Sequence, residues 1–475
     1  MIRLERAHQG ARPGFLCALL ATFSLYAHTA DAQDAGPPAR IPDAQAEPPA
    51  PPAAPVASTP TASPPATMPE PSWPVSGIYT VPDTKDLGNL TGLQFFKGIK
   101  VRGWIDAYYA WNFNHPSRST VDANPSGIRG VSPTIQGRTF DIHDRSITLS
   151  LAEVEVEKVP EVGGAGFKFD LAFGETQDIM FDSIVAGGGQ LTPLDRVFQH
   201  ASLSYIAPVG RGLRFDLGKF VTHIGGETIE TVKNWNYSHA FFYTYAIPFQ
   251  DTGLHISYPW SDSFYTDLYV VNGWNSTVDF NDYPTVGPAI GWIASPWLSI
   301  YANYLGGPEQ KNNNGNVRHL VDAQVFLGPF GGLNALINFD YGTEKIPDAA
   351  GGGTHQVSWW GPTAMLRYKI SDTFEPSIRA EYYNDDDGFT TGFAQKLVGL
   401  TATLNTKLGV GKSNGGVLLV RPEFRFDKSI AKTDGTHFFI DHDGAANPAT
   451  GTNVPAFIAN TDTQVTVDLG IAYMF

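Results

Sequence analysis

The sequence is short of cysteine, of long apolar runs and of positive charge. Its single cysteine, Cys17, cannot form an intramolecular disulfide, which excludes a disulfide-stapled secreted domain. No apolar run of about 18 residues occurs after residue 32, which excludes a helical membrane protein. With 32 Lys and Arg against 47 Asp and Glu, the formal charge is −15, so we expect no nucleic acid partner.

The first 92 residues do not have the pattern of a folded domain. Residues 1–32 combine basic residues, the apolar run GFLCALLATFSLYA and small residues up to Ala32, which predicts a cleaved signal peptide. Residues 36–74 contain 14 prolines and few large apolar residues. Such a composition predicts a disordered, extended arm, so residues 33–92 are expected to be a periplasmic linker. A plain spacer and a contact with the cell wall both remain open for this arm.

Beyond residue 93, apolar and polar residues alternate with the period of two that is typical of strands. The final stretch, VTVDLGIAYMF, sets Val467, Leu469 and Ile471 against Asp468 and Gly470. The same alternation predicts sixteen strands, near residues 98–112, 140–157, 166–175, 196–207, 212–223, 251–260, 263–273, 286–295, 297–305, 317–328, 331–342, 356–370, 373–384, 395–408, 416–427 and 463–475.

The connections between these strands alternate between short and long. Short ones are rich in turn residues, such as PVGRG at 208–212, whereas long ones include 113–139, 224–250 and 428–462. Aromatic residues on the outward faces also gather near both strand ends. Tight turns at one rim, long loops at the other and two aromatic belts are features of a transmembrane β-barrel.

We therefore predict an all-β protein, a transmembrane antiparallel up-and-down β-barrel of about 16 strands over residues 93–475. Counts of 14 or 18 strands remain open. In lipid the last strand must pair with the first, so that no backbone group is left unpaired. A terminal aromatic residue, Phe475, also resembles the signal that outer-membrane assembly machinery recognises. A barrel of this width leaves a water-filled lumen.

Charged residues of both signs lie on the inward faces of the predicted strands, where contact with water avoids the free-energy cost of burying a charge. Basic residues on the later strands could form a stripe opposite the acidic residues Glu153, Glu155 and Asp170; local neutralisation by neighbouring glutamates is the alternative. The pore-lining candidates are Arg102, Asp106, Lys168, Asp170, Arg214, Asp216, Arg367, Lys369, Arg379, Glu381, Arg421, Glu423 and Arg425.

The long connection 224–250 is unusually aromatic for an external loop. Its rings need a surface to pack on, which favours a segment that folds back into the barrel and narrows it; packing on the rim or against another subunit is the alternative. The constriction candidates are Trp235, Tyr237, Phe241 and Tyr243.

No motif indicates catalysis, a metal or a cofactor. Gly411-Lys412-Ser413 lacks the glycine that a phosphate-binding loop needs at position 406. His143 and the scattered serines have no spacing typical of a catalytic triad, and Asp385-Asp386-Asp387 is more typical of a solvated loop tip than of a Ca²⁺ site. We expect no enzyme.

Two stretches, SITLSLAEVEVEKVP (146–160) and NYSHAFFYTYAIPFQDTGLHISYPW (236–260) with the following YVVNGWN, resemble the OmpL-like β-barrel porins of Gram-negative outer membranes. The resemblance covers about residues 93–475 and implies a porin in the outer membrane. Expected partners are the lipid bilayer, the assembly machinery and small solutes, with a homotrimer as an option. Passive diffusion of small hydrophilic solutes or ions is the expected function. A substrate-specific porin for sugars or anions, and an envelope-anchoring barrel, are the alternatives.

Overall fold

The computed structural model describes residues 85–116, 135–186, 193–348, 351–392, 394–410, 416–430, 437–439, 441 and 461–475, all within one compact unit, Ser63–Phe475. The predicted signal peptide and most of the predicted linker lie outside these residues. Within the described ranges, none of the helices has the length and apolar character needed to cross a membrane.

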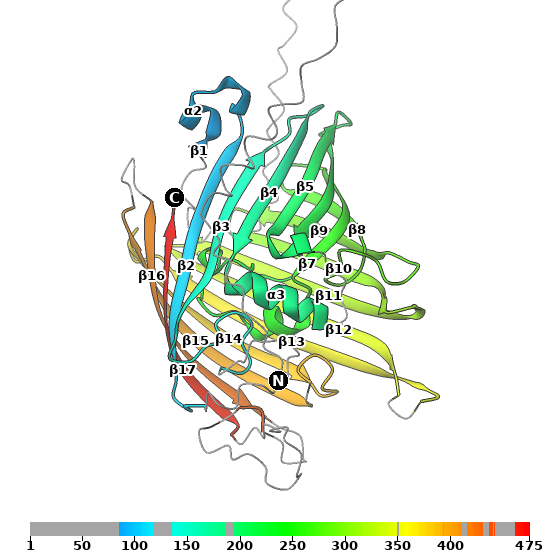
Figure 1. Ribbon diagram of the computed structural model, residues 1–475, viewed down its shortest axis with the longest axis vertical. Helices are drawn as coiled ribbons and strands as arrows, with labels where there is room; N and C mark the ends of the chain where they lie inside the picture. Colours follow the sequence, from blue (N-terminus) through cyan, green and yellow to red (C-terminus); the bar gives the residue numbers. More distant parts are fainter. Residues whose placement is uncertain are drawn as a thin grey trace, which may run out of the picture. The chain divides into compact units, whose positions relative to one another are not determined.

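Sixteen long strands form one continuous antiparallel sheet, which confirms the predicted fold class and strand number (Figure 1). Most strands begin and end within a few residues of the predicted positions. The strands are β2 (Lys100–Asn112), β3 (Ile147–Lys158), β4 (Ala165–Phe173), β5 (Phe198–Ala207), β6 (Leu213–Val221), β7 (Gln250–Pro259), β8 (Phe264–Val271), β9 (Thr285–Ser295), β10 (Leu298–Gln310), β11 (Asn313–Phe330), β12 (Leu333–Pro347), β13 (Thr354–Tyr368), β14 (Phe374–Asp385), β15 (Gln395–Leu408), β16 (Val417–Ser429) and β17 (Thr463–Met474).

The sheet closes because β17 pairs with β2, from Thr466 opposite Asn112 to Met474 opposite Trp104. Phe475 continues this pairing by exchanging two backbone hydrogen bonds with Gly103, of 2.9 and 3.1 Å. Each of the sixteen strands therefore has a neighbour on both sides. A closed ring of this kind is the form in which β-structure can cross lipid.

The two faces of the ring differ as the alternation predicts. On β17, Val467, Leu469 and Ile471 are exposed on the outside, whereas Asp468 and Gly470 are buried on the inside. Most of the exposed tyrosine and tryptophan rings lie near strand ends, as expected for the interfaces of a bilayer. Trp274 belongs to neither belt: it follows β8 and stacks on Arg318 inside the barrel, with 4.7 Å between the guanidinium carbon and the ring centroid.

A short element precedes the barrel and lies at the end with the short turns. β1 (Lys85–Asp86) pairs with Lys100 and Val101 of β2, and α2 (Leu87–Thr91) follows it. The Asp86 carboxylate accepts hydrogen bonds from the backbone N–H groups of Gly98 and Asn89, which lower its pKa. β1 and α2 thus lie inside the stretch predicted as linker, and a 3-10 turn, η2 (Gln94–Phe96), leads into β2.

Several boundaries at the long-loop end differ from the prediction. The expected strand 140–157 begins only at Ile147, because residues 135–146 turn into the lumen. The expected loops 306–316 and 343–355 are largely strand, since β10 to β13 continue as tall hairpins. Asn312, with φ of 56°, helps to close the first hairpin in two residues. The expected loop 176–195 contains α3 (Glu175–Ala186), which packs on β3 and β4, and η4 (Pro193–Arg196).

The centre of the barrel is filled by connections that fold inward. The connection between β6 and β7, residues 222–249, has almost all of its residues buried and is named the inserted segment here. It contains η5 (Thr231–Lys233) and η6 (Phe242–Ala246), which is a π-helical turn. Its rings pack with residues 135–146; for example, Phe140 lies edge-on to His239 at 5.0 Å between ring centroids.

Candidate functional site: the lumen and its inserted segment

The inserted segment starts and ends at neighbouring points of the wall. Val221 and Gln250 are cross-strand partners, and the Thr222 N–H donates to the Phe249 carbonyl at 3.0 Å. Between these points, Gly225 adopts a φ of 86° that favours glycine, and its position leaves no room for a Cβ beside the Ile247 and Phe242 side chains. The chain can therefore turn sharply from the wall into the lumen.

The aromatic residues expected to form a constriction all lie inside the barrel. Trp235, Tyr237, Phe241 and Tyr243 are each at most 2% exposed. Cationic side chains of the wall stack on three of these rings: Arg367 on Trp235 at 4.9 Å, Arg421 on Tyr237 at 5.7 Å, and Arg425 on Phe241 at 4.7 Å, measured to the ring centroid. Cation–π contacts in a desolvated place add about 2 kcal/mol each.

Arg421 on β16 binds the backbone of the inserted segment. Its Nη1 donates to the Thr231 carbonyl at 2.6 Å and its Nη2 to the Asn234 carbonyl at 2.9 Å. Its Nε donates to Asn405 on the neighbouring strand at 2.8 Å. A guanidinium presents several donors in a fixed plane, so one side chain can satisfy carbonyl groups that have left regular secondary structure.

Arg379 on β14 and Arg425 on β16 bind a second point of the inserted segment, Ser238-His239. Arg379 forms an ion pair with Glu227 of the inserted segment at 2.9 Å and donates to the Ser238 carbonyl. Arg425 donates to the His239 carbonyl at 2.6 Å. Both arginines are fully buried.

Wall carboxylates bind the N–H groups of the same stretch. Glu423 accepts from Tyr237 N–H at 2.6 Å and from Ser238 N–H at 3.0 Å, and Glu381 accepts from Phe241 N–H at 2.5 Å. Ion-assisted hydrogen bonds of this type are stronger than neutral ones. The wall therefore provides hydrogen-bond partners for backbone N–H and C=O groups of a segment that forms no β-ladder.

The inserted segment reaches the opposite wall as well. Thr231 donates to Asp106 on β2 at 2.7 Å, and Lys233 donates to Glu155 on β3 at 2.8 Å. Lys233 also lies 4.8 Å above the Trp104 ring. The segment thus spans the lumen from β14–β16 to β2–β3.

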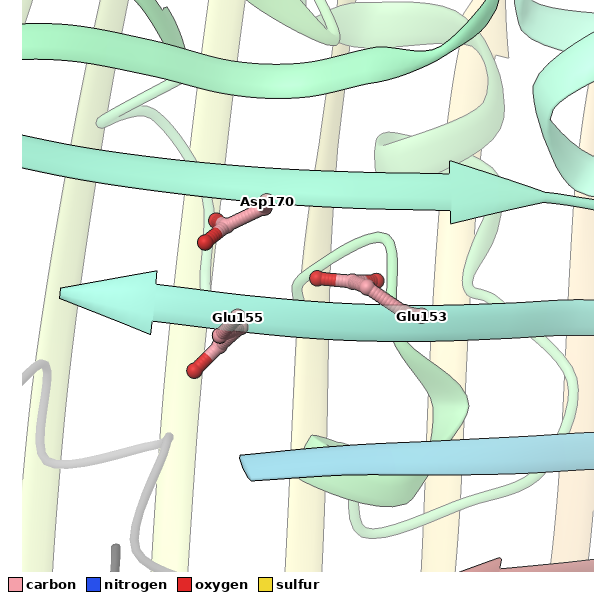
Figure 2. Close-up of side chains that lie close together, drawn as sticks. All are labelled: Glu153, Glu155 and Asp170. Atoms are coloured by element: carbon pink, nitrogen blue, oxygen red, sulfur yellow. The ribbon is translucent and has the colours of Figure 1, made fainter. Parts of the chain in front are cut away.

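Glu153, Glu155 and Asp170 form an acidic cluster on β3 and β4, with one oxygen of each within 4.8 Å of the others. Figure 2 shows their carboxylates pointing to the same side of the two strands. Cationic side chains lie beside two of these carboxylates: Arg102 and Lys233 bind Glu155, and Lys168 lies 3.5 Å from Asp170. Two of the three carboxylates thus have cationic partners within the chain, and we assign no metal here.

Basic residues of the later strands are also neutralised close by. Arg379 and Arg425 both pair with Glu381, at 3.2 and 3.4 Å, and Lys407 pairs with Glu375 at 2.9 Å. This geometry favours the alternative of local neutralisation over two unscreened stripes facing each other.

All the pore-lining candidates except Lys369 are on inward faces of barrel strands. Lys369 lies in the turn after β13, where its hydrogen bond to Asp372 raises the pKa of the ammonium and lowers that of the carboxyl. The inward-facing candidates are Arg102 and Asp106 on β2, Lys168 and Asp170 on β4, Arg214 and Asp216 on β6, Arg367 on β13, Arg379 and Glu381 on β14, and Arg421, Glu423 and Arg425 on β16.

Solvent reaches only some of these residues. The side chains of Arg102, Lys168 and Arg214 remain 21%, 27% and 17% exposed, whereas those of Arg379 and Arg425 are fully buried. The three exposed cations lie in the half of the barrel nearer the short turns. The lumen is therefore wetter there than at mid-height, where the inserted segment lies.

Sequence reasoning missed residues that come from connections. Glu227 and Lys233 of the inserted segment form ion pairs with the wall. Arg138 of the connection 113–146 donates to Thr466 on β17 at 2.6 Å and lies 3.4 Å from Asp468. The one available signal was that charged residues accompany the aromatic ones in segments too long for simple loops.

Gly470 on β17 offers a test of this packing. A Cβ at this position would overlap the Tyr237 ring, so we expect Gly470→Val to push Tyr237 away from Glu423 and Asp106. Overpacking typically costs about 1–3 kcal/mol. The variant should keep its barrel but melt at a lower temperature and conduct more current in planar bilayers.

The outward-facing substitution Leu469→Val is the matched control for this test. Tyr237→Ala removes the overlap, so adding Gly470→Val to Tyr237→Ala should lower the melting temperature no further. A Gly470→Val protein with unchanged melting temperature and conductance would contradict the described packing.

A family model agrees with this architecture. The family model described as "Putative beta-barrel porin-2, OmpL-like" matches residues 98–474. No curated protein matches the chain.

Solved structures with a similar fold include the outer membrane channel DcaP of Acinetobacter baumannii (TM-score 0.48, 10% identity, 79% of this chain and 97% of that chain covered). An anion-selective porin from Comamonas acidovorans is similar as well (TM-score 0.43, 12% identity, 79% of this chain and 99% of that chain covered). So is OmpT of Vibrio cholerae (TM-score 0.43, 10% identity, 80% of this chain and 98% of that chain covered). All three TM-scores are below 0.5, so these likenesses carry no argument about this chain. The family match covers the whole barrel, and the chain therefore belongs to the OmpL-like β-barrel porins, which form channels in the outer membrane.

Proposed function

We propose that the protein lets small hydrophilic solutes and ions diffuse passively through its lumen, and that the inserted segment sets the size limit. The observation that carries this proposal is the two-sided attachment of the segment at mid-height. Arg421 and Glu423 bind it from one wall, and Asp106 and Glu155 bind it from the other. A wide barrel needs such a constriction to reject large molecules, because sixteen strands alone leave an aqueous channel.

Basic side chains in the wetter half of the lumen support a role in ion selection. Arg102, Lys168 and Arg214 retain solvent contact near the end with the short turns, so their charge acts on ions in the pore. Their partners Glu155, Asp170 and Asp216 are more deeply buried, which leaves the cations nearer to the water.

Reconstitution of the full chain tests this proposal. We expect ion conductance in planar bilayers and swelling of liposomes with small sugars but not with larger oligosaccharides. Replacing Arg102, Lys168 and Arg214 by Gln should shift the reversal potential in a salt gradient toward cation preference, because the lumen loses three positive charges while their acidic partners remain.

The control replaces three exposed cations of the rims, Lys158, Arg211 and Lys345, by Gln. The same shift in both variants would assign selectivity to the overall charge rather than to the lumen. A purified protein without any conductance would contradict the channel itself.

We further propose that the protein performs no catalysis. Among the described residues, the hydrogen bond between a histidine ring and a serine hydroxyl joins His200 Nε2 to Ser202 Oγ at 2.8 Å. His200 Nδ1 has no hydrogen-bond partner among the described residues, so a third group that would orient the base is missing.

The proposed placement of the N-terminal arm in the periplasm is supported by β1. It pairs with the first residues of β2, at the end where the short turns lie, and short turns face the periplasm in bacterial barrels. The signal peptide, the cell-wall contact, the homotrimer and the recognition of the strand ending at Phe475 by assembly machinery remain proposals from the sequence.

A further inference from the structure

A second feature of the lumen lies at its opposite end, where β10 to β13 extend as tall hairpins. The inner side of these hairpins and Phe389 of the β14–β15 connection form an open pocket of about 570 Å³, which lies within the volume range of small-molecule sites. Its lining includes Gln310, Lys311, Arg318, Glu344 and Phe389. None of these residues belongs to the inserted segment or to its attachment points.

The hydrogen-bond acceptors in this pocket are already occupied. Glu344 accepts from Gln310 Nε2 at 2.8 Å with one oxygen and from Arg318 Nε at 2.8 Å with the other. Gln310 Oε1 accepts from both Asn313 and Asn316 at 2.9 Å. A ligand that offers mainly donors would therefore find few free partners.

The free groups are donors. Arg318 uses Nε and Nη2 on Glu344, the latter at 2.7 Å, and its Nη1 makes no hydrogen bond to any described residue. Lys311, exposed at the hairpin tip, likewise has no hydrogen bond or ion pair with the described part of the chain. Stacking on Trp274 at 4.7 Å and on Phe389 at 5.4 Å fixes the plane of the Arg318 guanidinium. The donors are thus held in place before a ligand arrives.

Another carboxylate, that of Glu309, faces Arg318, but no hydrogen bond joins these two described residues. Its two oxygens accept from Thr285 Oγ1 at 2.6 Å and from the Trp274 N–H at 2.7 Å. The remaining pocket wall is apolar and is formed by Phe389, Ile346 and Pro347.

We propose that this pocket binds small organic anions, with a carboxylate on Arg318 Nη1 and Lys311 and an apolar body against Phe389. A carboxylate matches unfilled cationic donors better than a neutral polyol does, because charge-assisted hydrogen bonds are the stronger ones. At the outer mouth of the barrel, the pocket would raise the local concentration of such solutes before they cross. As a solute assignment it rests on the proposed channel, but binding is measurable independently of conduction.

Equilibrium dialysis with the full chain in detergent tests this proposal, with benzoate as the anionic probe and benzamide as its neutral analogue of the same shape. We expect saturable benzoate binding and at least tenfold weaker benzamide binding, roughly the worth of one charged hydrogen bond. Lys311→Gln and Phe389→Ala should each weaken benzoate binding several-fold. Arg318→Lys should do the same, because it keeps the charge beside Glu344 but removes the free Nη1.

Lys345→Gln is the matched control, since Lys345 neighbours Glu344 on β12 but is exposed on the other face. Heat-dependent gel mobility checks that each variant is folded. Equal binding of benzoate and benzamide, binding of maltotriose instead of benzoate, or variants with unchanged affinity would each overturn the proposal. Benzoate binding by a protein without conductance would contradict the proposed channel function and support the proposed binding pocket.

Discussion

Removing the inserted segment is expected to raise single-channel conductance several-fold. Residues 223–248 can be replaced by Asn-Gly, because Thr222 and Phe249 are already hydrogen-bonded neighbours and a two-residue turn joins such positions. The barrel ladder is untouched by this change. Water would then fill the mid-height of the lumen and hydrate Arg379, Arg421 and Arg425, which a sixteen-stranded ring can accommodate.

Planar-bilayer recordings measure this effect, and liposome swelling with oligosaccharides of increasing size measures the accompanying change in the size limit. A protein with residues 348–353 replaced by the same Asn-Gly turn controls for loop shortening, since Pro347 and Thr354 are cross-strand partners at the rim. If the two shortened proteins conducted alike, the inserted segment would not be the constriction.

Arg379→Ala is expected to release the inserted segment without opening the barrel wall. The substitution removes the ion pair with Glu227 and the hydrogen bonds to Ser238 and His239, and it leaves the Glu227 carboxylate buried. Removing one partner of a buried ion pair costs about 3–5 kcal/mol. This cost affects the docked segment, because the antiparallel ladder around Arg379 does not depend on its side chain.

Frequent opening events in bilayer recordings and faster proteolysis within residues 222–249 would report the release. Arg379→Lys should give an intermediate effect, since it restores charge but not the planar set of donors. Arg211→Ala is the surface control: Arg211 pairs with the exposed Asp262, and exposed pairs contribute at most about 1 kcal/mol. Equal behaviour of Arg379→Ala and Arg211→Ala would mean that the segment is held by its aromatic packing alone.

The barrel can be predicted from the sequence because the alternation of apolar and polar residues that specifies each strand is local. Lipid demands apolar residues at every second position, and a pattern such as Val467, Asp468 and Leu469 states which side of a strand faces outward. The predicted starts of β2 and β17 fall within two residues of the observed ones for this reason.

Predictions failed where a connection gains its partners from the lumen. Ile147, rather than residue 140, begins β3 because Phe140 packs inside against His239. Trp274 is an aromatic residue near the end of β8, where an interfacial position is expected, but its ring stacks on Arg318 of β11, which is not adjacent to β8 in the sheet. Neither partner is detectable from spacing along the chain.

The sequence by itself determined the ring of strands, the outward apolar face and the presence of charged residues on the inward face, since period-two alternation suffices for each. Only the tertiary structure decided that Arg379, Arg421 and Arg425 serve the inserted segment, and that Arg318 and Lys311 keep free donors at the other end. The physical reason is that a buried ion pair or a free donor depends on where distant segments meet, and closure of the barrel brings residues 222–249 against strands more than a hundred residues away.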